Sequence, residues 1–326
     1  MIFKLLLICI LNLIIFSNLK RISLFINLYD FPDKKRKIHT VATPSIGGVI
    51  LFANLTSILL FDILSNNLEY NYLILFLTSA VIFFISLIDD KFNITPNKKF
   101  FFIGLAVFFF IFFNGELLIS RILFDFYKFS IKNYFLKFFI TWLCIMLFLN
   151  AMNLYDGVNC QLGLYTIFIF SFFLLNNIFF DLSLLIIIFL FFFTYFNFKN
   201  KIFLGDNGSF LLAFIIAFII ISNNSTPKIL SAEKIFLLMF VPGLDMLRLF
   251  IERLFNNRNP FIADKFHIHH LCLQKISQKK FLFLNVLFYS LPIILSYKIN
   301  NIFLIFVLVF LYILLVYKYL NHNFKN

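Results

Sequence analysis

The sequence predicts an all-α, polytopic membrane protein with about eleven transmembrane helices, and two observations carry this prediction. Hydrophobic residues make up 62% of the 326 residues and charged residues only 13%, about half the charged fraction of a soluble domain. Long apolar runs also repeat from one end of the chain to the other, without a long linker or an internal repeat. So few charges could not cover a soluble core of this size. We therefore expect a single integral membrane domain over residues 1–326.

Each expected helix is a run close to the roughly 20 apolar residues that cross a bilayer. The runs lie near 2–19, 44–61, 72–88, 100–114, 134–150, 161–176, 178–196, 207–222, 234–251, 281–297 and 300–319. Lys4 and the run after it resemble a signal peptide, but no small-residue cleavage site follows Phe16, which favours a retained helix. The boundary between the sixth and seventh runs is the weakest, because only Asn176, Asn177 and Asp181 mark it.

The basic residues predict the orientation, because Lys and Arg accumulate on the cytoplasmic side of a membrane. With the N-terminus outside, 20 of the 28 Lys and Arg residues fall in inward loops or the C-terminal tail. We therefore expect the N-terminus outside and the C-terminus in the cytoplasm. The net charge of +13 would then attract anionic lipids and phosphorylated substrates, although positive-inside bias alone would also explain it.

Five inward connections carry most of the chain's polar chemistry. Nine of the 15 carboxylates fall on this side, together with every histidine that lies between spans. Ionisable residues at such positions are functional candidates. A transporter would more often place them in mid-span, whereas the middles of these spans are apolar. This distribution favours a site at the membrane surface over a pathway through the membrane.

The first inward connection reads Asp30-Phe-Pro-Asp-Lys-Lys-Arg-Lys-Ile-His39 and is followed by Pro44-Ser-Ile-Gly-Gly48. Its basic cluster, which includes Lys37, could hold phosphate, and the glycines would allow close backbone approach. A juxtamembrane basic run is more often only a topology signal, so this motif is weak by itself.

The second connection begins with two adjacent carboxylates, Asp89 and Asp90, at the end of an apolar run. Two such charges need compensation, and the helix dipole at a C-terminus makes a plain cap a poor explanation. Paired aspartates with nearby oxygen ligands suit Mg²⁺, which is commonly shared with phosphates. Alternatively, Lys91, Lys98 and Lys99 only solvate the helix end.

The third connection holds Asn150, Asn153 and Asp156, which recur every three residues and so share one side of a helical turn. Their amides and carboxylate could recognise a nucleobase or a sugar. Helix-end capping by Asn and Asp explains the same pattern about as well.

The fourth connection, Phe203-Leu-Gly-Asp-Asn-Gly-Ser209, puts Asp206 between glycines at the start of a span. This carboxylate could approach a metal or phosphate closely, although a turn with an N-cap is the commoner use of such a segment.

The fifth connection is the longest and contains Arg253, Pro260-Phe-Ile-Ala-Asp264 and the histidines His267, His269 and His270. The histidines lack the i, i+4 spacing of a helical zinc site and have no cysteine partner. Arginines flank them, which favours a hydrogen-bonding cradle for a diphosphate or a sugar.

Together these motifs resemble the polyprenyl-phosphate N-acetylhexosamine-1-phosphate transferase family, which belongs to the glycosyltransferase 4 family. The resemblance rests on Asp-Asp after the third span, Asn-x-x-Asn-x-x-Asp-Gly after the fifth and Leu-Gly-Asp-x-Gly-Ser before the eighth, and it covers nearly the whole chain. The final motif, His267-Ile-His-His270 after Pro260-Phe-x-x-Asp264, resembles the UDP-GlcNAc:undecaprenyl-phosphate GlcNAc-1-phosphate transferase branch. In one place the chain departs from the family, which commonly reads Asp-Gly-x-Asp/Asn-Gly-Leu where this chain reads Asp156-Gly-Val-Asn-Cys-Gln161. The second acidic position is Asn159, and Cys160 replaces the following glycine.

The resemblance implies a Mg²⁺-dependent enzyme, with Mn²⁺ as an alternative, that joins a sugar phosphate from a UDP-N-acetylhexosamine to undecaprenyl phosphate. It implies a bacterial inner-membrane protein, an active site on the cytoplasmic face, a homodimer and no nucleic-acid partner. Asp90 and Asp206 are expected to hold the metal, and Asp89 and Asp90 to act in catalysis. The expected substrate-binding residues are Lys37, Lys99, Asn150, Asn153, Asp156, Arg253, His267, His269 and His270.

Three other functions remain open from the sequence. Within the same family, the chain could transfer phospho-N-acetylmuramoyl-pentapeptide. A polytopic transporter or flippase would need no Mg²⁺-dependent chemistry, and a non-catalytic scaffold would leave five polar motifs unexplained. The sequence does not identify the N-acetylhexosamine or the glycan that the product begins.

Overall fold

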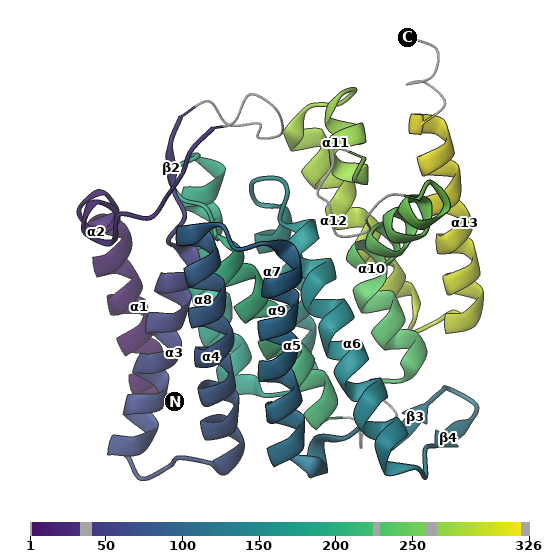
Figure 1. The fold of residues 1–326 in the computed structure, drawn as a ribbon, viewed down its shortest axis with the longest axis horizontal. Coiled ribbons are helices and arrows are strands. Elements are labelled where there is room, and N and C mark those ends of the chain that lie inside the picture. Colours follow the sequence, from purple (N-terminus) through teal and green to yellow (C-terminus); the bar gives the residue numbers. More distant parts are fainter. Residues whose placement is uncertain (1, 33–40, 224–228, 258–265, 321–326) are drawn as a thin grey trace. The chain divides into compact units, whose positions relative to one another are not determined.

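The structure is a computed structural model that describes residues 2–32, 41–223, 229–257 and 266–320. The chain divides into two compact units. The first comprises Met1–Leu118 and Phe135–Ser222, and the second comprises Ile119–Tyr134 and Asn223–Asn326. Helices make up most of both units (Figure 1). The expected all-α class is therefore confirmed, while the expectation of one domain stays a prediction.

The helices of the first unit follow the apolar pattern of the sequence. They are α1 (Ile2–Ser17), α2 (Leu19–Ile26), α3 (Gly47–Leu64), α4 (Tyr70–Phe92), α5 (Pro96–Phe113), α6 (Tyr134–Tyr155), α7 (Gln161–Leu175), α8 (Phe180–Phe198) and α9 (Asp206–Ser222). Each of the first eight expected runs overlaps one of them. A short antiparallel pair, β1 (Tyr29–Asp30) with β2 (Thr43–Pro44), and the 3₁₀ turn η1 (Gly115–Leu117) complete the described elements of this unit.

Helix α9 lies at the centre of the first unit, where it packs against α3 and α4. Every residue from Asn207 to Ile220 is buried, as expected for a helix that is apolar on all sides. Its N-terminus lies against the start of α3, where the Gly48 N–H donates to the Leu204 carbonyl at 2.9 Å. A Cβ on Gly48 would lie 2.3 Å from the Gly208 nitrogen, so only glycine permits this approach.

One polar pair lies inside the first unit, between helices whose middles were expected to be apolar. The Asn12 amide of α1 donates to Asn54 Oδ1 of α3 at 2.7 Å, and Asn54 donates back at 3.2 Å. Each amide also donates to the carbonyl four residues earlier in its own helix, at 2.8 Å. Such reciprocal bonds join neighbouring membrane helices without leaving a buried polar group unpaired. The two asparagines therefore have a structural role, because their hydrogen bonds join α1 to α3.

The second unit contains the hairpin β3 (Arg121–Leu123) and β4 (Lys128–Ser130), and the helices α10 (Ala232–Phe255), α11 (Ile268–Leu273), α12 (Gln278–Leu295) and α13 (Asn301–Leu320). The last three expected runs overlap α10, α12 and α13. Helix α10 packs against α12 and α13, and α11 contacts the same two helices. Asp125 of the hairpin turn donates its N–H to the buried Glu233 carboxylate at 3.1 Å, and Asn301 donates to Asp125 at 2.7 Å. These bonds tie the hairpin to the start of α10 and α13.

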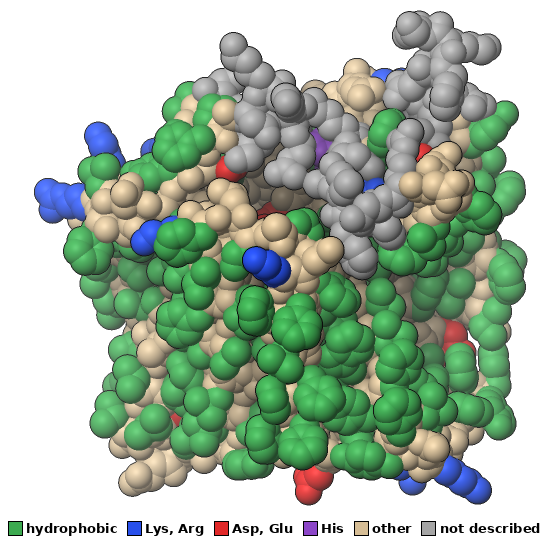
Figure 2. Space-filling model, in the orientation of Figure 1, with side chains coloured by type: hydrophobic (Ala, Val, Ile, Leu, Met, Phe, Trp, Pro, Cys, Tyr) green, Lys and Arg blue, Asp and Glu red, His purple; other side chains and the backbone are tan. Residues whose placement is uncertain are grey.

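Seven of the described helices are long and apolar enough to cross a membrane: α3, α4, α5, α6, α8, α12 and α13. An eighth span is possible if α1 and α2, which are bent by 77° at Asn18, count as one. Helices α7 and α9 are apolar but shorter. Hydrophobic side chains cover most of the visible surface (Figure 2), as expected for a polytopic membrane protein. The count of eleven spans and the orientation of the termini stay predictions.

Candidate active site

The Asp89–Asp90 pair lies where α4 meets the start of α9. Helix α4 continues through both aspartates to Phe92 and ends at Asn93, which has the left-handed φ of 52°. The Asp90 carboxylate accepts the backbone N–H groups of Asp206 at 3.1 Å and Asn207 at 3.0 Å, and also the Asn207 amide. The positive N-terminus of α9 therefore compensates a carboxylate that the dipole of α4 disfavours.

Lys99 joins two carboxylates at this position. It comes from α5, and its Nζ lies 2.8 Å from Asp89 Oδ2 and in direct contact with Asp206 Oδ2. Its ammonium also lies 4.7 Å from the centre of the Phe210 ring. Asp89 and Lys99 are largely buried, so their charges interact through a medium of lower dielectric constant than water. The structure thus joins the second and fourth motifs of the sequence through residues of three helices, α4, α5 and α9.

The third motif reaches the same cluster through Asn153. Its amide donates to Asp206 Oδ1 and to Ser209 Oγ, both at 2.9 Å. Asn150 behaves differently, because its amide donates to the Met146 carbonyl of its own helix at 2.7 Å. The three residues of this motif therefore do not all point at one group.

Asp156 follows the end of α6, where the negative charges of Asp90 and Asp206 act on its carboxyl group. Burial, and then the charges of Asp206 and Asp90, raise the pKa of its carboxyl to about 7. We define the carboxylate cluster as Asp89, Asp90, Asp156, Asp206 and Lys99. Four carboxylates and one ammonium give it a formal charge of −3 when all are ionised. This oxygen-rich, negative set has the chemistry of a site for a hard divalent cation such as Mg²⁺. Asp90 and Asp206 are its candidate ligands, and a cation at Asp206 Oδ2 would replace the Lys99 ammonium.

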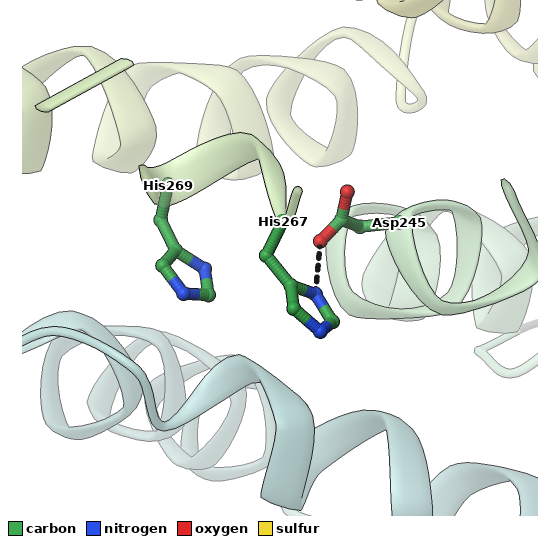
Figure 3. A group of neighbouring side chains, drawn as sticks. All are labelled: Asp245, His267 and His269. Atoms are coloured by element: carbon green, nitrogen blue, oxygen red, sulfur yellow. Dashed lines mark hydrogen bonds and ion pairs between the residues drawn. The ribbon is translucent and has the colours of Figure 1, made fainter. Parts of the chain in front are cut away.

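In the second unit, His267 is bound to a buried aspartate. Its Nδ1 lies 2.8 Å from Asp245 Oδ2, and both side chains are buried (Figure 3). Asp245 Oδ1 also accepts from Arg248 Nη2 at 2.9 Å, from the Tyr312 hydroxyl at 3.0 Å and from the Ile268 N–H at 3.2 Å. One carboxylate thus holds α10, α11 and α13 together.

The other two histidines of the motif pack beside His267. The His269 ring stacks on the His267 ring with centres 5.4 Å apart, and the His270 ring lies 4.4 Å from that of His269. His269 is 1% exposed, and its Nδ1 has no hydrogen-bond partner among the described residues. Burial, and then the neighbouring histidines, hold the pKa of His269 well below its usual value, so this ring is neutral.

The remaining expected residues are placed only in part. Arg253 is buried in the last turn of α10. Lys37, and the Pro260–Asp264 segment that supports the branch, lie outside the described residues.

Comparisons with known proteins find relatives of the kind that these motifs resemble. A sequence model described as glycosyl transferase family 4 matches residues 72–224, which include the carboxylate cluster. A probable undecaprenyl-phosphate N-acetylglucosaminyl 1-phosphate transferase of Bacillus subtilis is 26% identical over 79% of this chain and 73% of its own length. An undecaprenyl-phosphate alpha-N-acetylglucosaminyl 1-phosphate transferase of Escherichia coli K12 is 26% identical over 78% and 71%. An enzyme of the same name from Thermotoga maritima is 29% identical over 82% and 81%.

Residues 72–224 of the chain are thus similar to glycosyl transferase family 4. The three relatives carry the name of the undecaprenyl-phosphate GlcNAc-1-phosphate transferase branch, which the final histidine motif also resembles.

This chain departs from the pattern of the family it resembles at a position where the backbone is unusual. Cys160 stands where the family commonly has glycine, and its φ of 67° is in the left-handed region that favours glycine. Its N–H donates to Asn197 Oδ1 at 2.5 Å, which helps to hold this conformation. Gln161 follows at 1% exposure, and neither polar atom of its side chain has a partner among the described residues. The chain thus adopts a left-handed backbone conformation with cysteine at the position where the family commonly has glycine.

Sequence reasoning missed several residues that support the two clusters. Asn207 and Ser209 stand in the fourth motif, where their polar side chains were the available signal. Asp245 and Arg248 precede the final histidine motif along the chain, and their charges were the available signal. Tyr312 gave no signal, because it lies in an apolar run 67 residues after Asp245.

Proposed function

We propose that this protein transfers N-acetylglucosamine 1-phosphate from UDP-GlcNAc to undecaprenyl phosphate. An oxygen of the lipid phosphate attacks the β-phosphorus of the donor, the bond from that phosphorus to the bridging oxygen breaks, and UMP leaves. The product is a polyprenyl-diphosphate sugar. The names of the three relatives support this reaction, and their similarity extends over most of the chain.

The observation that carries the proposal is the joining of Asp89, Asp206 and Lys99 from three helices. Phosphoryl transfer needs positioning and charge stabilisation more than covalent help from the protein. Asp90 and Asp206 are our assigned metal ligands, and Mg²⁺ or Mn²⁺ bound there would neutralise the donor diphosphate. Lys99 would bind phosphate oxygens that compete with the carboxylates for its ammonium.

Asp89 is proposed to orient the lipid phosphate or to take its proton. A phosphate dianion needs little activation, so orientation is the larger part of this role. Asp156 is proposed to contact the nucleoside. Asn153 already donates to Asp206, so its first role is to hold that carboxylate in place.

The remaining assignments rest on the family resemblance. Lys37 is proposed to bind phosphate and Asn150 the nucleoside. Arg253, His267, His269 and His270 are proposed to bind the diphosphate and the sugar. We also propose a cytoplasmic active site in the bacterial cell membrane, where the lipid arrives laterally and the sugar nucleotide from solution.

Release of UMP from UDP-GlcNAc by the purified protein with undecaprenyl phosphate tests the proposal. The reaction should require Mg²⁺ or Mn²⁺, stop in EDTA and fall by roughly 100-fold or more in Asp206→Asn. Glu116→Gln, an exposed carboxylate outside the cluster, is the matched control and should keep full activity. Release from UDP-N-acetylmuramoyl-pentapeptide alone would move the chain to the other branch. Transport in liposomes without UMP release would contradict the transferase.

A further inference from the structure

The buried group formed by Asp245, His267 and His269 in the second unit first suggests a metal site. One ligand atom from each side chain lies within 4.8 Å of the others. The hydrogen bonds of Asp245 argue against this interpretation, because its Oδ1 already accepts from the Arg248 guanidinium at 2.9 Å. The 2.8 Å separation of Asp245 and His267 is also that of a hydrogen bond.

The contacts of Asp245 determine which nitrogen of His267 carries a proton. An ionised carboxylate can only accept hydrogen bonds, and Asp245 accepts from a guanidinium, a hydroxyl and a backbone N–H. Nδ1 of His267 must therefore donate its proton to Asp245. The ring is held in one orientation, and Nε2 is left on the side away from Asp245, as Figure 3 shows. Nε2 makes no hydrogen bond with a described residue.

We propose that Asp245 is a positioning residue that fixes the ring and tautomer of His267, so that Nε2 is presented to the sugar nucleotide. This inference rests on the proposed function, in which His267 contacts that substrate. Buried carboxylates orient functional imidazoles in this way in many enzymes. Asp245 also accepts the N–H of Ile268, the first residue of α11, and so fixes the backbone beside the ring.

His269 has no such support. Its buried Nδ1 lacks a partner among the described residues, and its ring packs flat against His267. His267 and His269 therefore have different surroundings, and His267 is the one of these two that a hydrogen bond to Asp245 holds in a fixed orientation.

Asp245→Asn should reverse the tautomer without changing the size of the side chain. Oδ1 accepts from three donors, Arg248, Tyr312 and Ile268, so the carbonyl oxygen of the asparagine must remain there. Its NH₂ group then takes the place of Oδ2 and donates to Nδ1 of His267. The proton moves to Nε2. The ring then presents an N–H donor at Nε2, where the neutral ring of the native protein presents an acceptor nitrogen.

Steady-state kinetics of four variants test this role: Asp245→Asn, His267→Gln, the double variant, and Glu252→Gln as the control. Glu252 also contacts Arg248, at 3.2 Å, but does not touch His267. Each single site variant should raise the KM for the UDP-sugar about tenfold to hundredfold, the range for a hydrogen bond with a charged group. The double variant should lose no more than His267→Gln, and the KM for undecaprenyl phosphate should stay unchanged. The proposal would be overturned if the increase in KM of the double variant were the product of the two single increases. It would also be overturned if the variants raised the KM for both substrates equally.

¹⁵N spectra of histidine-labelled full-length protein give a readout independent of activity. The native His267 signal, assigned by its loss in His267→Gln, should show a protonated Nδ1, and Asp245→Asn should move the proton to Nε2. An unchanged tautomer overturns the inference, as does a stoichiometric metal that co-purifies with the native protein and is lost in both variants. If no UDP-sugar yields UMP, the proposed function fails, while the spectra still decide the role of Asp245.

Discussion

Lys99 is the residue on which the charge balance of the carboxylate cluster depends. Its ammonium contacts Asp89 and Asp206, and the side chain is largely buried. Lys99→Met keeps the apolar stem but leaves two carboxylates uncompensated, which costs about 3 kcal/mol or more when a buried pair is broken. We expect a lower melting temperature in detergent and loss of UMP release.

The neighbouring Lys98 gives the matched control for this experiment, because it is exposed on the same helix. Lys98→Met should melt like the native protein and keep its activity. Equal stability of the two variants would mean that Lys99 does not hold the cluster together.

Asp156 predicts a pH dependence of stability in the metal-free protein. Burial and the nearby carboxylates raise its pKa to about 7, above the roughly 3.9 expected for the unfolded chain. Between these values the folded state binds a proton that the unfolded state does not. Stability from this group therefore falls as the pH rises from about 4 to 7, and then levels off.

Melting curves in EDTA between pH 5 and 8 measure this effect. The native protein should lose more stability across that range than Asp156→Asn, which cannot ionise. Glu116→Gln should follow the native curve, since Glu116 is exposed and outside the cluster. Parallel curves for the native protein and Asp156→Asn would show that Asp156 is not held protonated.

At the scale of elements, the contact of α3 with α9 sets the geometry of the cluster. A Cβ at Gly48 would lie 1.9 Å from Asn207 Oδ1 and 2.3 Å from the Gly208 nitrogen. Gly48→Ala must therefore push the start of α9 away, and with it the N–H groups that hold Asp90. We expect a destabilisation of about 1–3 kcal/mol, as for other overpacked interiors, and a marked loss of activity.

Gly243→Ala is the matched control, because nothing lies within 4 Å of the added Cβ in α10. There alanine should stabilise the helix by up to about 1 kcal/mol. Both variants can be compared by their melting temperatures and by UMP release. If Gly48→Ala behaves like Gly243→Ala, the two helices are not in the close contact that the structure describes.

These elements also show which parts of the fold and of the site can be predicted from the sequence. Apolar run length predicted α1 and α3 to α9, because a membrane helix must satisfy its own backbone. The family resemblance predicted that Asp90 and Asp206 belong together, and the Asp90 carboxylate accepts the Asp206 N–H. It could not predict that Asn150 turns to its own helix while Asn153 bonds Asp206, because both lie on one face and the rotamer depends on packing. The pairing of Asp245 with Tyr312 depends on a long-range contact that no local pattern carries.

For the whole molecule, the decisive expectation is that the polar motifs of both units face the cytoplasm. It depends on the proposed N-out orientation and on an odd number of crossings, and it can be tested without a structure. Single cysteines at Asn67 and Asn300 should be outside, and those at Asn93 and Gln274 inside. All four positions are exposed in turns or helix ends, and the four native cysteines can first be changed to alanine.

A membrane-impermeant maleimide should then label Asn67→Cys and Asn300→Cys in intact cells. Asn93→Cys and Gln274→Cys should react only after the membrane is permeabilised. Gln274 follows the histidine motif and Asn93 follows the aspartate pair, so these two positions report the sides on which the two motifs lie. Labelling of only one of them from outside would put the histidines and the carboxylate cluster on opposite faces. The two groups could not then act on one sugar nucleotide, and the proposed roles of His267 and Asp206 in one reaction would be wrong.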